Sequence, residues 1–157
     1  MAMTDRLEQL KGIQLFSGLK QPALELIARI AQEEHHKKGT KIFRHGDPGE
    51  KLYLILNGRV RISREVPGMG EEALAILGPG QMFGEMALLD ESPRSADANV
   101  HENCELLAVP RDGFDELLFV NKELAYEVLW SIVQMLVARL RETNDKLTFL
   151  STSNKFS

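Results

Sequence analysis

The sequence predicts a mainly β domain, a small antiparallel barrel or roll, with helices at both ends of the chain. Two observations lead to this fold class. Apolar residues recur at helical spacings of three and four before residue 33 and after residue 110. Between these limits, short apolar runs are each closed by Gly, Pro, Asn or Asp. The 157 residues suit one domain, which we divide into N-terminal helices (1–32), a β-roll (33–110) and C-terminal helices (111–150).

The N-terminal segment predicts two helices. Their apolar positions are Leu7, Leu10 and Ile13, followed by Leu24, Ile27 and Ala28. The stretch FSGLKQP, residues 16–22, separates the two groups. Pro22 suits the first turn of the second helix, because a proline lacks the N–H that this turn would leave unpaired.

The central segment reads as a series of short strands. LYLIL and RVRIS are separated by Asn57-Gly58, a dipeptide typical of tight hairpin turns. RVRISREV alternates polar with apolar residues at the strand period of two. SADANV and CELLAVP read as two further strands. We therefore expect a hairpin at 57–58 within an antiparallel barrel or roll.

The C-terminal segment predicts one short and one long helix. Asp112 can cap a helix over about 113–119, and Asn121 can cap another over about 122–147. Both side chains carry an oxygen that can accept a backbone N–H at a helix start.

Composition argues against several classes of protein. The net charge of −4 and the pI near 5.6 argue against a stand-alone nucleic-acid binder, which usually has a clustered basic face. The single cysteine, Cys104, excludes an internal disulfide and a multi-cysteine metal site. The N-terminus lacks a signal-like apolar core, and no run reaches the ~18 apolar residues of a membrane span. We expect a cytoplasmic protein that does not bind membranes.

The residues that carry chemistry lie in the stretch FGEMALLDESPRSADANV, residues 83–100. Its apolar start contains Glu85, and Arg94 follows in the same stretch. Burying either charge without a partner would be expensive. A bound ligand that uses both charges would remove this conflict.

A phosphate and a sugar hydroxyl together suit these two charges. Residues 85–89 read as one helical turn, and the unpaired amides at its start can bind an anion. The Arg94 guanidinium can hold two phosphate oxygens at once. Glu85 can accept a hydrogen bond from a sugar hydroxyl. An anion clamp beside a hydroxyl acceptor describes a site for a ribose phosphate.

Residues 83–96 resemble the phosphate-binding cassette of the cyclic nucleotide-binding domain family. The match runs through Gly84-Glu85-Met86-Ala87-Leu88-Leu89 and Pro93-Arg94-Ser95-Ala96. The resemblance implies a double-stranded, jelly-roll-like β-helix that binds cyclic AMP (cAMP) or cyclic GMP (cGMP). The site residues that it implies in this stretch are Phe83, Gly84, Glu85, Met86, Ala87, Arg94, Ser95 and Ala96.

The resemblance also implies a role for each of these residues. Glu85 would bind the ribose 2′-hydroxyl, and Arg94 would bind the cyclic phosphate. Gly84, Ser95 and Ala96 would contact the phosphate and the sugar. The backbone amides at positions 86 and 87 would lie nearby, and the aromatic ring at 83 would shape the pocket wall. The alternative is that Glu85 and Arg94 form a salt bridge with each other in a domain that binds no ligand.

The long helix carries two apolar faces. One is a heptad seam of Leu129, Val133, Leu136, Leu140, Thr143, Leu147 and Leu150. The other, formed by Ala125, Val128, Ile132 and Met135, would pack against the roll. A helix with two apolar faces needs two partners, so we expect a parallel homodimer through residues 121–150. The alternative is that the seam packs on the chain's own N-terminal helices.

A polar interruption of the seam, Thr143-Asn144, has a possible function. The stretch ARLRETNDKL is similar to the dimer helix of the bacterial catabolite activator (cyclic AMP receptor) family. The similarity implies that Thr143 contacts the adenine, which would favour cAMP over cGMP. Asn144 replaces that family's Ser and would reach the base from the other subunit. The alternative is that Thr143 only sets the register of the helices. The chain ends within about ten residues of this helix, so we expect no DNA-binding domain in it.

Together these features predict a stand-alone regulatory or sensor module, not an enzyme, which binds cAMP and signals through its C-terminal dimer helix. Two alternatives stay open: a cGMP-binding module, and a dimeric scaffold of the same fold without a ligand. The four histidines are His35, His36, His45 and His101. They do not have the spacing of a metal-binding β-barrel enzyme, so we expect no metal cofactor.

Overall fold

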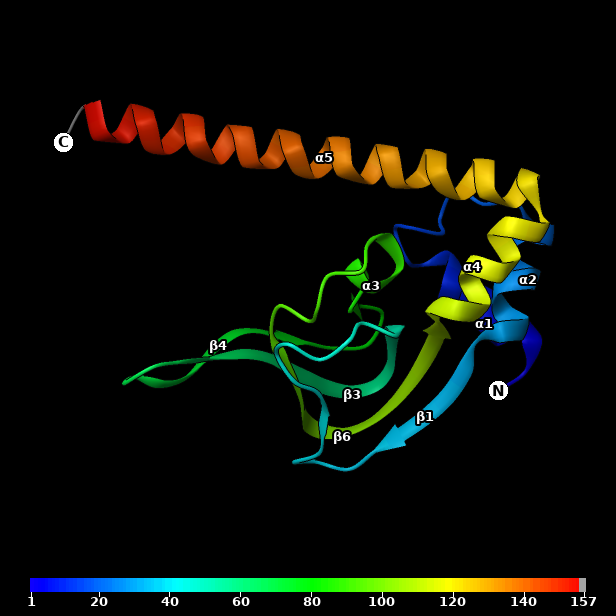
Figure 1. The fold of residues 1–157 in the computed structure, drawn as a ribbon, viewed down its shortest axis with the longest axis horizontal. Coiled ribbons are helices and arrows are strands. Elements are labelled where there is room, and N and C mark those ends of the chain that lie inside the picture. The colour runs from blue at the N-terminus through cyan, green and yellow to red at the C-terminus, as the bar shows by residue number, and fades with distance from the viewer. Residues whose placement is uncertain (156–157) are drawn as a thin grey trace.

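The computed structural model describes residues 1–155, apart from the side chains of Ala87 and of residues 153–155 (Figure 1). Its helices are α1 (Met3–Lys11), α2 (Gln21–Ile30), α3 (Met86–Leu89), α4 (Arg111–Val120) and α5 (Lys122–Lys155). Its strands are β1 (Gln32–His36), β2 (Lys41–Phe43), β3 (Lys51–Val66), β4 (Gly70–Leu77), β5 (Met82–Phe83) and β6 (Asp97–Pro110). The predicted order of helices, β-roll and helices is confirmed.

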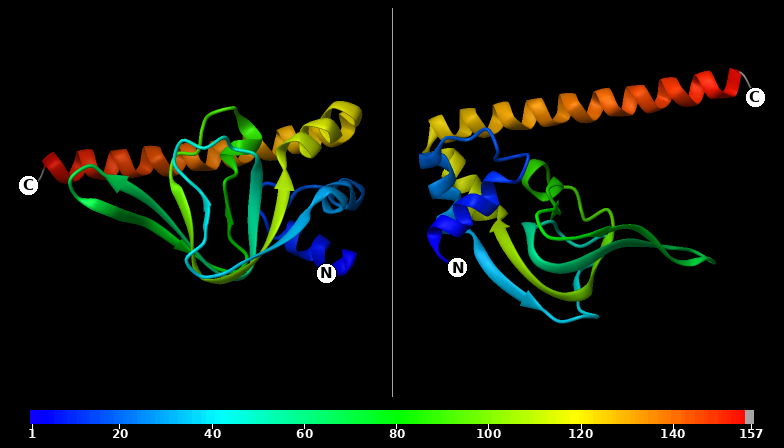
Figure 2. Two further views of the ribbon diagram at one scale, coloured as in Figure 1. Left: turned by 60° about the horizontal axis from the view of Figure 1, so that its bottom comes forward. Right: turned by 180° about the vertical axis from the view of Figure 1, so that it is seen from behind.

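The strands form one antiparallel sheet that curls into a roll, as Figure 2 shows from two sides. The order along the sheet is β1-β6-β3-β4, with β2 beside β6 and β5 beside β3. The long strands β3 and β6 pair from Lys51–Pro110 at one end to Ser63–Asp97 at the other. Because both strands bend together, they contribute to both halves of the roll. The predicted mainly β fold with flanking helices is therefore correct.

The hairpin predicted at Asn57-Gly58 is wrong. These residues lie inside the continuous strand β3, and the chain reverses instead between Val66 and Gly70. Gly58 has φ of +85°, and the β3–β6 register shifts on both sides of it. A Cβ atom there would collide with the carbonyl oxygen of Asn103 on β6. Gly58 thus forms a bulge at a point where β3 and β6 lie very close together. Glycine within a strand often marks such a bulge or close approach.

The same bend explains a second difference from the predicted strands. SADANV and CELLAVP belong to one strand, β6, and not to two. The charged and polar residues between them, at 101–103, lie where β6 follows the bulge of β3. A polar interruption that resembles a loop in the sequence is therefore a bend in a paired strand.

Two apolar clusters form the core. One fills the end of the roll beneath α1, α2, α4 and the first half of α5, and it includes Phe16, Leu107 and Phe114. The other lies inside the roll and includes Tyr53 and Leu106. The helices at the right of Figure 1 therefore close one end of the roll.

The helix starts agree in part with the predictions. The Asn121 side chain caps α5, since its Oδ1 accepts the Leu124 N–H at 3.0 Å. Pro22 lies in the first turn of α2, as expected. The predicted cap at Asp112 is wrong, because α4 begins at Arg111 and Asp112 lies within its first turn. An acidic residue there still stabilises the positive end of the helix.

The long helix α5 is packed along one half and free along the other. Of the four residues predicted for its inner face, Val128 and Met135 are buried and Ala125 and Ile132 are partly buried. Leu124 and Ser131 are buried as well. The predicted seam is exposed, with Leu129 64% and Leu140 61% accessible. The alternative in which this seam packs on the N-terminal helices is therefore wrong. Within residues 1–155, no helix is both long and apolar enough to cross a membrane.

The bulge at Gly58 predicts a large loss of stability for Gly58→Ala. The positive φ should cost about 1–2 kcal/mol, and the collision with β6 should add about 1–3 kcal/mol. Urea unfolding of both this variant and Gly39→Ala measures the difference. Gly39 has a similar φ of +91° but open space around it, so its variant carries the dihedral strain alone. Equal losses in the two variants would contradict the close approach at Gly58.

Candidate functional site

A pocket of about 350 Å³ lies in the roll, and all of its lining residues fall within residues 43–96. Its polar side is formed by the two parts of the cassette, 83–86 and 92–96. Its apolar side is formed by Phe43, Ile62, Leu77 and Met82 together with Phe83. The structure thus brings together the separate motifs that predicted a ribose phosphate site.

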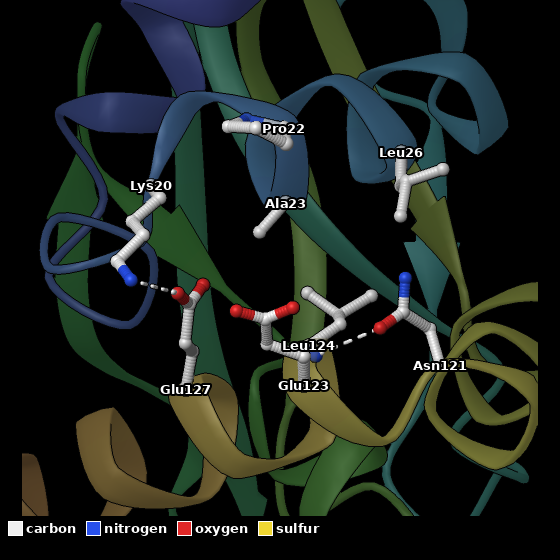
Figure 3. A pocket seen from close by; sticks show the side chains of 8 residues that line it. All are labelled: Lys20, Pro22, Ala23, Leu26, Asn121, Glu123, Leu124 and Glu127. Carbon is white, nitrogen blue, oxygen red and sulfur yellow. Dashed lines mark hydrogen bonds and ion pairs between the residues drawn. The ribbon is translucent and has the colours of Figure 1, made fainter.

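A smaller pocket of about 110 Å³ lies between α2 and the start of α5 (Figure 3). The Nζ atom of Lys20 there lies 3.9 Å from the Glu127 carboxylate, so a carboxylate already neutralises the nearest cation. The side-chain oxygen of Asn121 already accepts a hydrogen bond as the cap of α5. This pocket holds no group prepared for an anion, and we assign the site to the larger one.

Gly84 allows the cassette to close on itself. Its φ is +74°, and a Cβ atom at this position would lie 2.5 Å from Nη1 of Arg94. A side chain at 84 would therefore strain the backbone and displace the guanidinium. The next residue, Glu85, begins the single turn of α3, in which Leu88 N–H bonds to Glu85 O at 3.1 Å.

Arg94 is the central side chain of the pocket and is only 7% exposed. Its Nη1 donates to Gly84 O at 3.1 Å, and its Nη2 donates to Lys51 O at 2.7 Å. The guanidinium carbon lies 4.1 Å from the centre of the Phe43 ring. These contacts fix the plane of the guanidinium before any ligand arrives.

Arg94 forms no ion pair with the side chains that the structure describes, and its buried Nε has no hydrogen-bond acceptor among them. Burial lowers the pKa of Arg94 below its usual value, but a guanidinium keeps its proton in proteins. A buried, prepositioned cation with a free donor is the arrangement that an anionic ligand would complete.

Glu85 does not pair with Arg94. One of its carboxylate oxygens, Oε1, accepts from Nη2 of Arg139 on α5 at 3.1 Å. The alternative in which the two cassette charges neutralise each other is therefore wrong. Glu85 lines the pocket, and no hydrogen bond among the described residues uses its second oxygen, so a sugar hydroxyl could donate to it.

The other predicted cassette residues lie in or beside the pocket. Phe83 is buried, lines the pocket and stacks on Tyr53 with ring centres 4.9 Å apart. Ser95 and Ala96 also line it, and so does Met86. Ala87 lies in α3, but its side chain falls outside the described residues.

The predicted base contacts on α5 are not part of the pocket wall. Thr143 and Asn144 are exposed, and the Thr143 hydroxyl donates to Arg139 O at 2.9 Å. Thr143 lies one helical turn beyond Arg139, whose side chain reaches Glu85. The contact of Thr143 and Asn144 with a base stays a prediction.

Several residues of the site were not found from the sequence, including Arg139, Phe43 and the apolar residues Ile62, Leu77 and Met82. Arg139 precedes Thr143 by four residues and so shares its side of the helix, a spacing that could have indicated it. Phe43 gave no local signal, because it reaches Arg94 from a separate strand. In the part of the chain that the structure describes, no three His, Cys, Asp or Glu side chains come together as a metal site.

Comparisons with known proteins agree with the observed fold. The pattern of the family described as "Cyclic nucleotide-binding domain" matches residues 33–121. The "Cyclic AMP receptor protein" of Thermus thermophilus is 40% identical over 142 residues, which are 90% of this chain and 64% of that protein. The chain thus spans less than two thirds of this relative.

Solved structures give the same result. The N-terminal domain of a transcriptional regulator from Streptomyces coelicolor matches with a TM-score of 0.77 and 31% identity, over 88% of this chain and 94% of that one. A cyclic nucleotide-binding domain from Methylobacillus flagellatus matches with a TM-score of 0.74 and 30% identity, over 92% and 81% of the two chains. The chain belongs to the cyclic nucleotide-binding domain family.

Proposed function

We propose that this chain is a regulatory module that binds cAMP and transmits the binding event through α5. The observation that carries this proposal is the buried Arg94 guanidinium, which is fixed by two carbonyls and forms no ion pair among the described side chains. The cyclic phosphate would supply a negatively charged partner. The ribose 2′-hydroxyl would donate to the free oxygen of Glu85, and the base would lie along the apolar side of the pocket.

The preference for cAMP is part of the same proposal. Arg139 on α5 contacts Glu85, which lines the pocket, and Thr143 occupies the next turn of the helix. Its hydroxyl can accept a hydrogen bond from the amino group of adenine. Asn144 could contribute to the same contact from a second subunit. A cGMP-binding module is the alternative, and binding of both nucleotides to the same protein distinguishes the two.

Coupling between ligand and helix would depend on Glu85. This carboxylate contacts α5 through Arg139 and would contact the sugar with its other oxygen. Two partners that share one residue affect each other's binding, which is the requirement for a ligand-controlled switch. The nucleotide would shift the position or order of the outer half of α5.

The output of the switch would be a change in a parallel homodimer. The exposed seam from Leu129 to Leu150 is an apolar stripe that only Thr143 interrupts, and stable monomers rarely expose such stripes. Heptad spacing is the pattern by which two such helices pack together. We include a cytoplasmic location in the proposal, since the one cysteine, Cys104, is buried as a free thiol.

Arg94→Ala should weaken cAMP binding by roughly ten- to a hundred-fold, or ~1.5–3 kcal/mol, because the charge-assisted bonds to the phosphate are lost. Isothermal calorimetry with cAMP and cGMP measures this loss, and thermal melting verifies that the variant is folded. Arg59→Ala is the control, since Arg59 is exposed and lies outside the pocket. An unchanged dissociation constant in Arg94→Ala would remove this site assignment. A dimer that binds neither nucleotide would be a scaffold.

Arg139→Gln should separate nucleotide binding from the response of α5. In the unmodified protein, cAMP should increase the protection of residues 131–147 from hydrogen exchange and change the fluorescence of Trp130. In the variant both responses should fall, because the charged contact with Glu85 is gone. Arg141→Gln is the control, as Arg141 projects about 160° away around the helix. A full response in Arg139→Gln would reject this coupling route.

Leu140→Glu should convert the proposed dimer into a monomer, since it places two carboxylates opposite each other in the seam. Sedimentation velocity across a range of protein concentrations measures the equilibrium. Phe119→Glu provides the comparison, because Phe119 is an exposed apolar residue on α4 and outside the seam. A monomeric unmodified protein, or a dimer that survives Leu140→Glu, would contradict the proposed interface.

A further inference from the structure

We propose that Asp97 is a positioning residue for the nucleotide site, and that it acts through the turn at residues 44–47 on the backbone of Arg94. This inference rests on the proposed function, because the consequence of the positioning is nucleotide affinity. Asp97 does not line the pocket itself. Its effect on the ligand would be indirect. It would act through hydrogen bonds that link the start of β6 to the turn at 44–47, and the turn to the backbone of Arg94.

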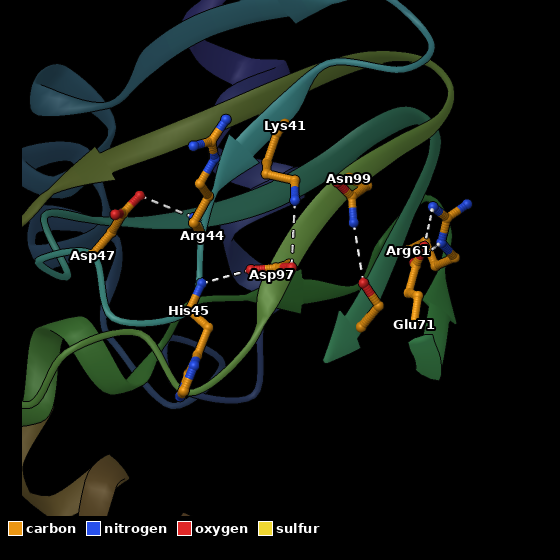
Figure 4. A network of polar contacts seen from close by, with 9 residues as sticks. Lys41, Arg44, His45, Asp47, Arg61, Glu71, Asp97 and Asn99 are labelled. Atoms are coloured by element: carbon orange, nitrogen blue, oxygen red, sulfur yellow. Dashed lines mark hydrogen bonds and ion pairs between the residues drawn. The ribbon is translucent and has the colours of Figure 1, made fainter. Parts of the chain in front are cut away.

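Two hydrogen bonds close the turn (Figure 4). The Asp47 N–H donates to Arg44 O at 3.0 Å, and the Arg44 N–H donates to Oδ2 of Asp47 at 2.9 Å. Gly46 supports the turn with φ of +91°, a dihedral that glycine adopts without strain. The turn is therefore a defined four-residue unit and not a loose loop.

The turn is bonded to Arg94 in both directions. The Gly46 N–H donates to Arg94 O at 2.8 Å, and the Arg94 N–H donates to Asp47 O at 2.8 Å. The two bonds join Arg94 to consecutive residues of the turn, so both its backbone N–H and its carbonyl are held. Any displacement of the turn would therefore move the backbone from which the phosphate-binding side chain extends.

Asp97 holds the other side of the turn. Its Oδ1 accepts the His45 N–H at 2.6 Å, and its Oδ2 lies 3.4 Å from Nζ of Lys41 on β2 (Figure 4). The side chain is buried, at 7% exposure, on the first residue of β6. The His45 N–H bond, together with the Lys41 charge, holds the pKa of Asp97 below its usual value, which is consistent with an ionised acceptor.

These contacts form a continuous connection from β6 through the turn to Arg94. A guanidinium binds a phosphate well when two of its N–H groups donate to two phosphate oxygens. Such binding groups must lie within about 0.5 Å of their productive positions. Removing the Asp97 carboxylate would leave the His45 N–H without its acceptor and release the turn from β2 and β6. The guanidinium would keep its carbonyl partners but lose the backbone anchor.

Three variants test this positioning role by calorimetry with cAMP and by hydrogen exchange of residues 44–47. Asp97→Ala should lower affinity about tenfold and increase exchange in the turn, since misplaced binding groups cost at least this much. Asp97→Asn keeps an oxygen that can accept the His45 N–H, so its affinity should stay within about threefold of the unmodified protein. Asn99→Ala is the control on the same strand, since it removes only the bond to Ser63.

The positioning role is rejected if Asp97→Ala binds cAMP as tightly as the unmodified protein. It is also rejected if Asn99→Ala, at an equal fall in melting temperature, loses as much affinity, because the effect would then be general destabilisation. Failure of the unmodified protein to bind either nucleotide would reject the proposed function instead. In that case, unchanged exchange at 44–47 in Asp97→Ala would separately show that Asp97 does not hold the turn.

Discussion

The burial of one cation without an ion pair among the described side chains, the guanidinium of Arg94, is the constraint on which the rest of the site depends. A buried charge is tolerated only when polar groups surround it closely. Here two backbone carbonyls accept its N–H groups and an aromatic ring covers its face. These partners come from three separated segments, at residues 43, 51 and 84. The curvature of the roll brings those segments together, so the fold and the anion site have a common origin.

The helix α5 joins this site to the outside of the molecule. Its inner half belongs to the core, and its outer half is exposed along an apolar seam. Arg139 contacts the cassette on the stretch of helix between the last buried residue, Met135, and the fully exposed end. A change at the pocket would therefore act on a helix that is anchored at one end and free at the other. This arrangement suits a switch better than a helix packed along its whole length, because less packing must be broken to move it.

The sequence predicted the elements whose signals are local. Helical periodicity located both groups of helices, and the side chain of Asn121 located the start of α5. The cassette was recognisable because Gly84, Glu85 and Arg94 lie close together in the sequence, in an order that resembles the family's motif. The Asn57-Gly58 hairpin failed because the same dipeptide suits a bulge, and only the facing strand determines which one forms. The predicted cap at Asp112 was wrong because α4 begins one residue earlier, at Arg111, with Pro110 in the capping position.

By itself the sequence determined the fold class, the cassette with its two opposite charges, and the apolar seam of the long helix. Each of these features depends on residues that are close together in the chain, where backbone geometry allows few alternative structures. Only the tertiary structure decided which groups those charges meet: Glu85 faces Arg139, far along the chain, and Arg94 faces Phe43, Lys51 and the turn at 44–47. Such partners are set by the way bent strands bring distant segments together. The spacing of residues in the sequence does not indicate which distant segments will meet.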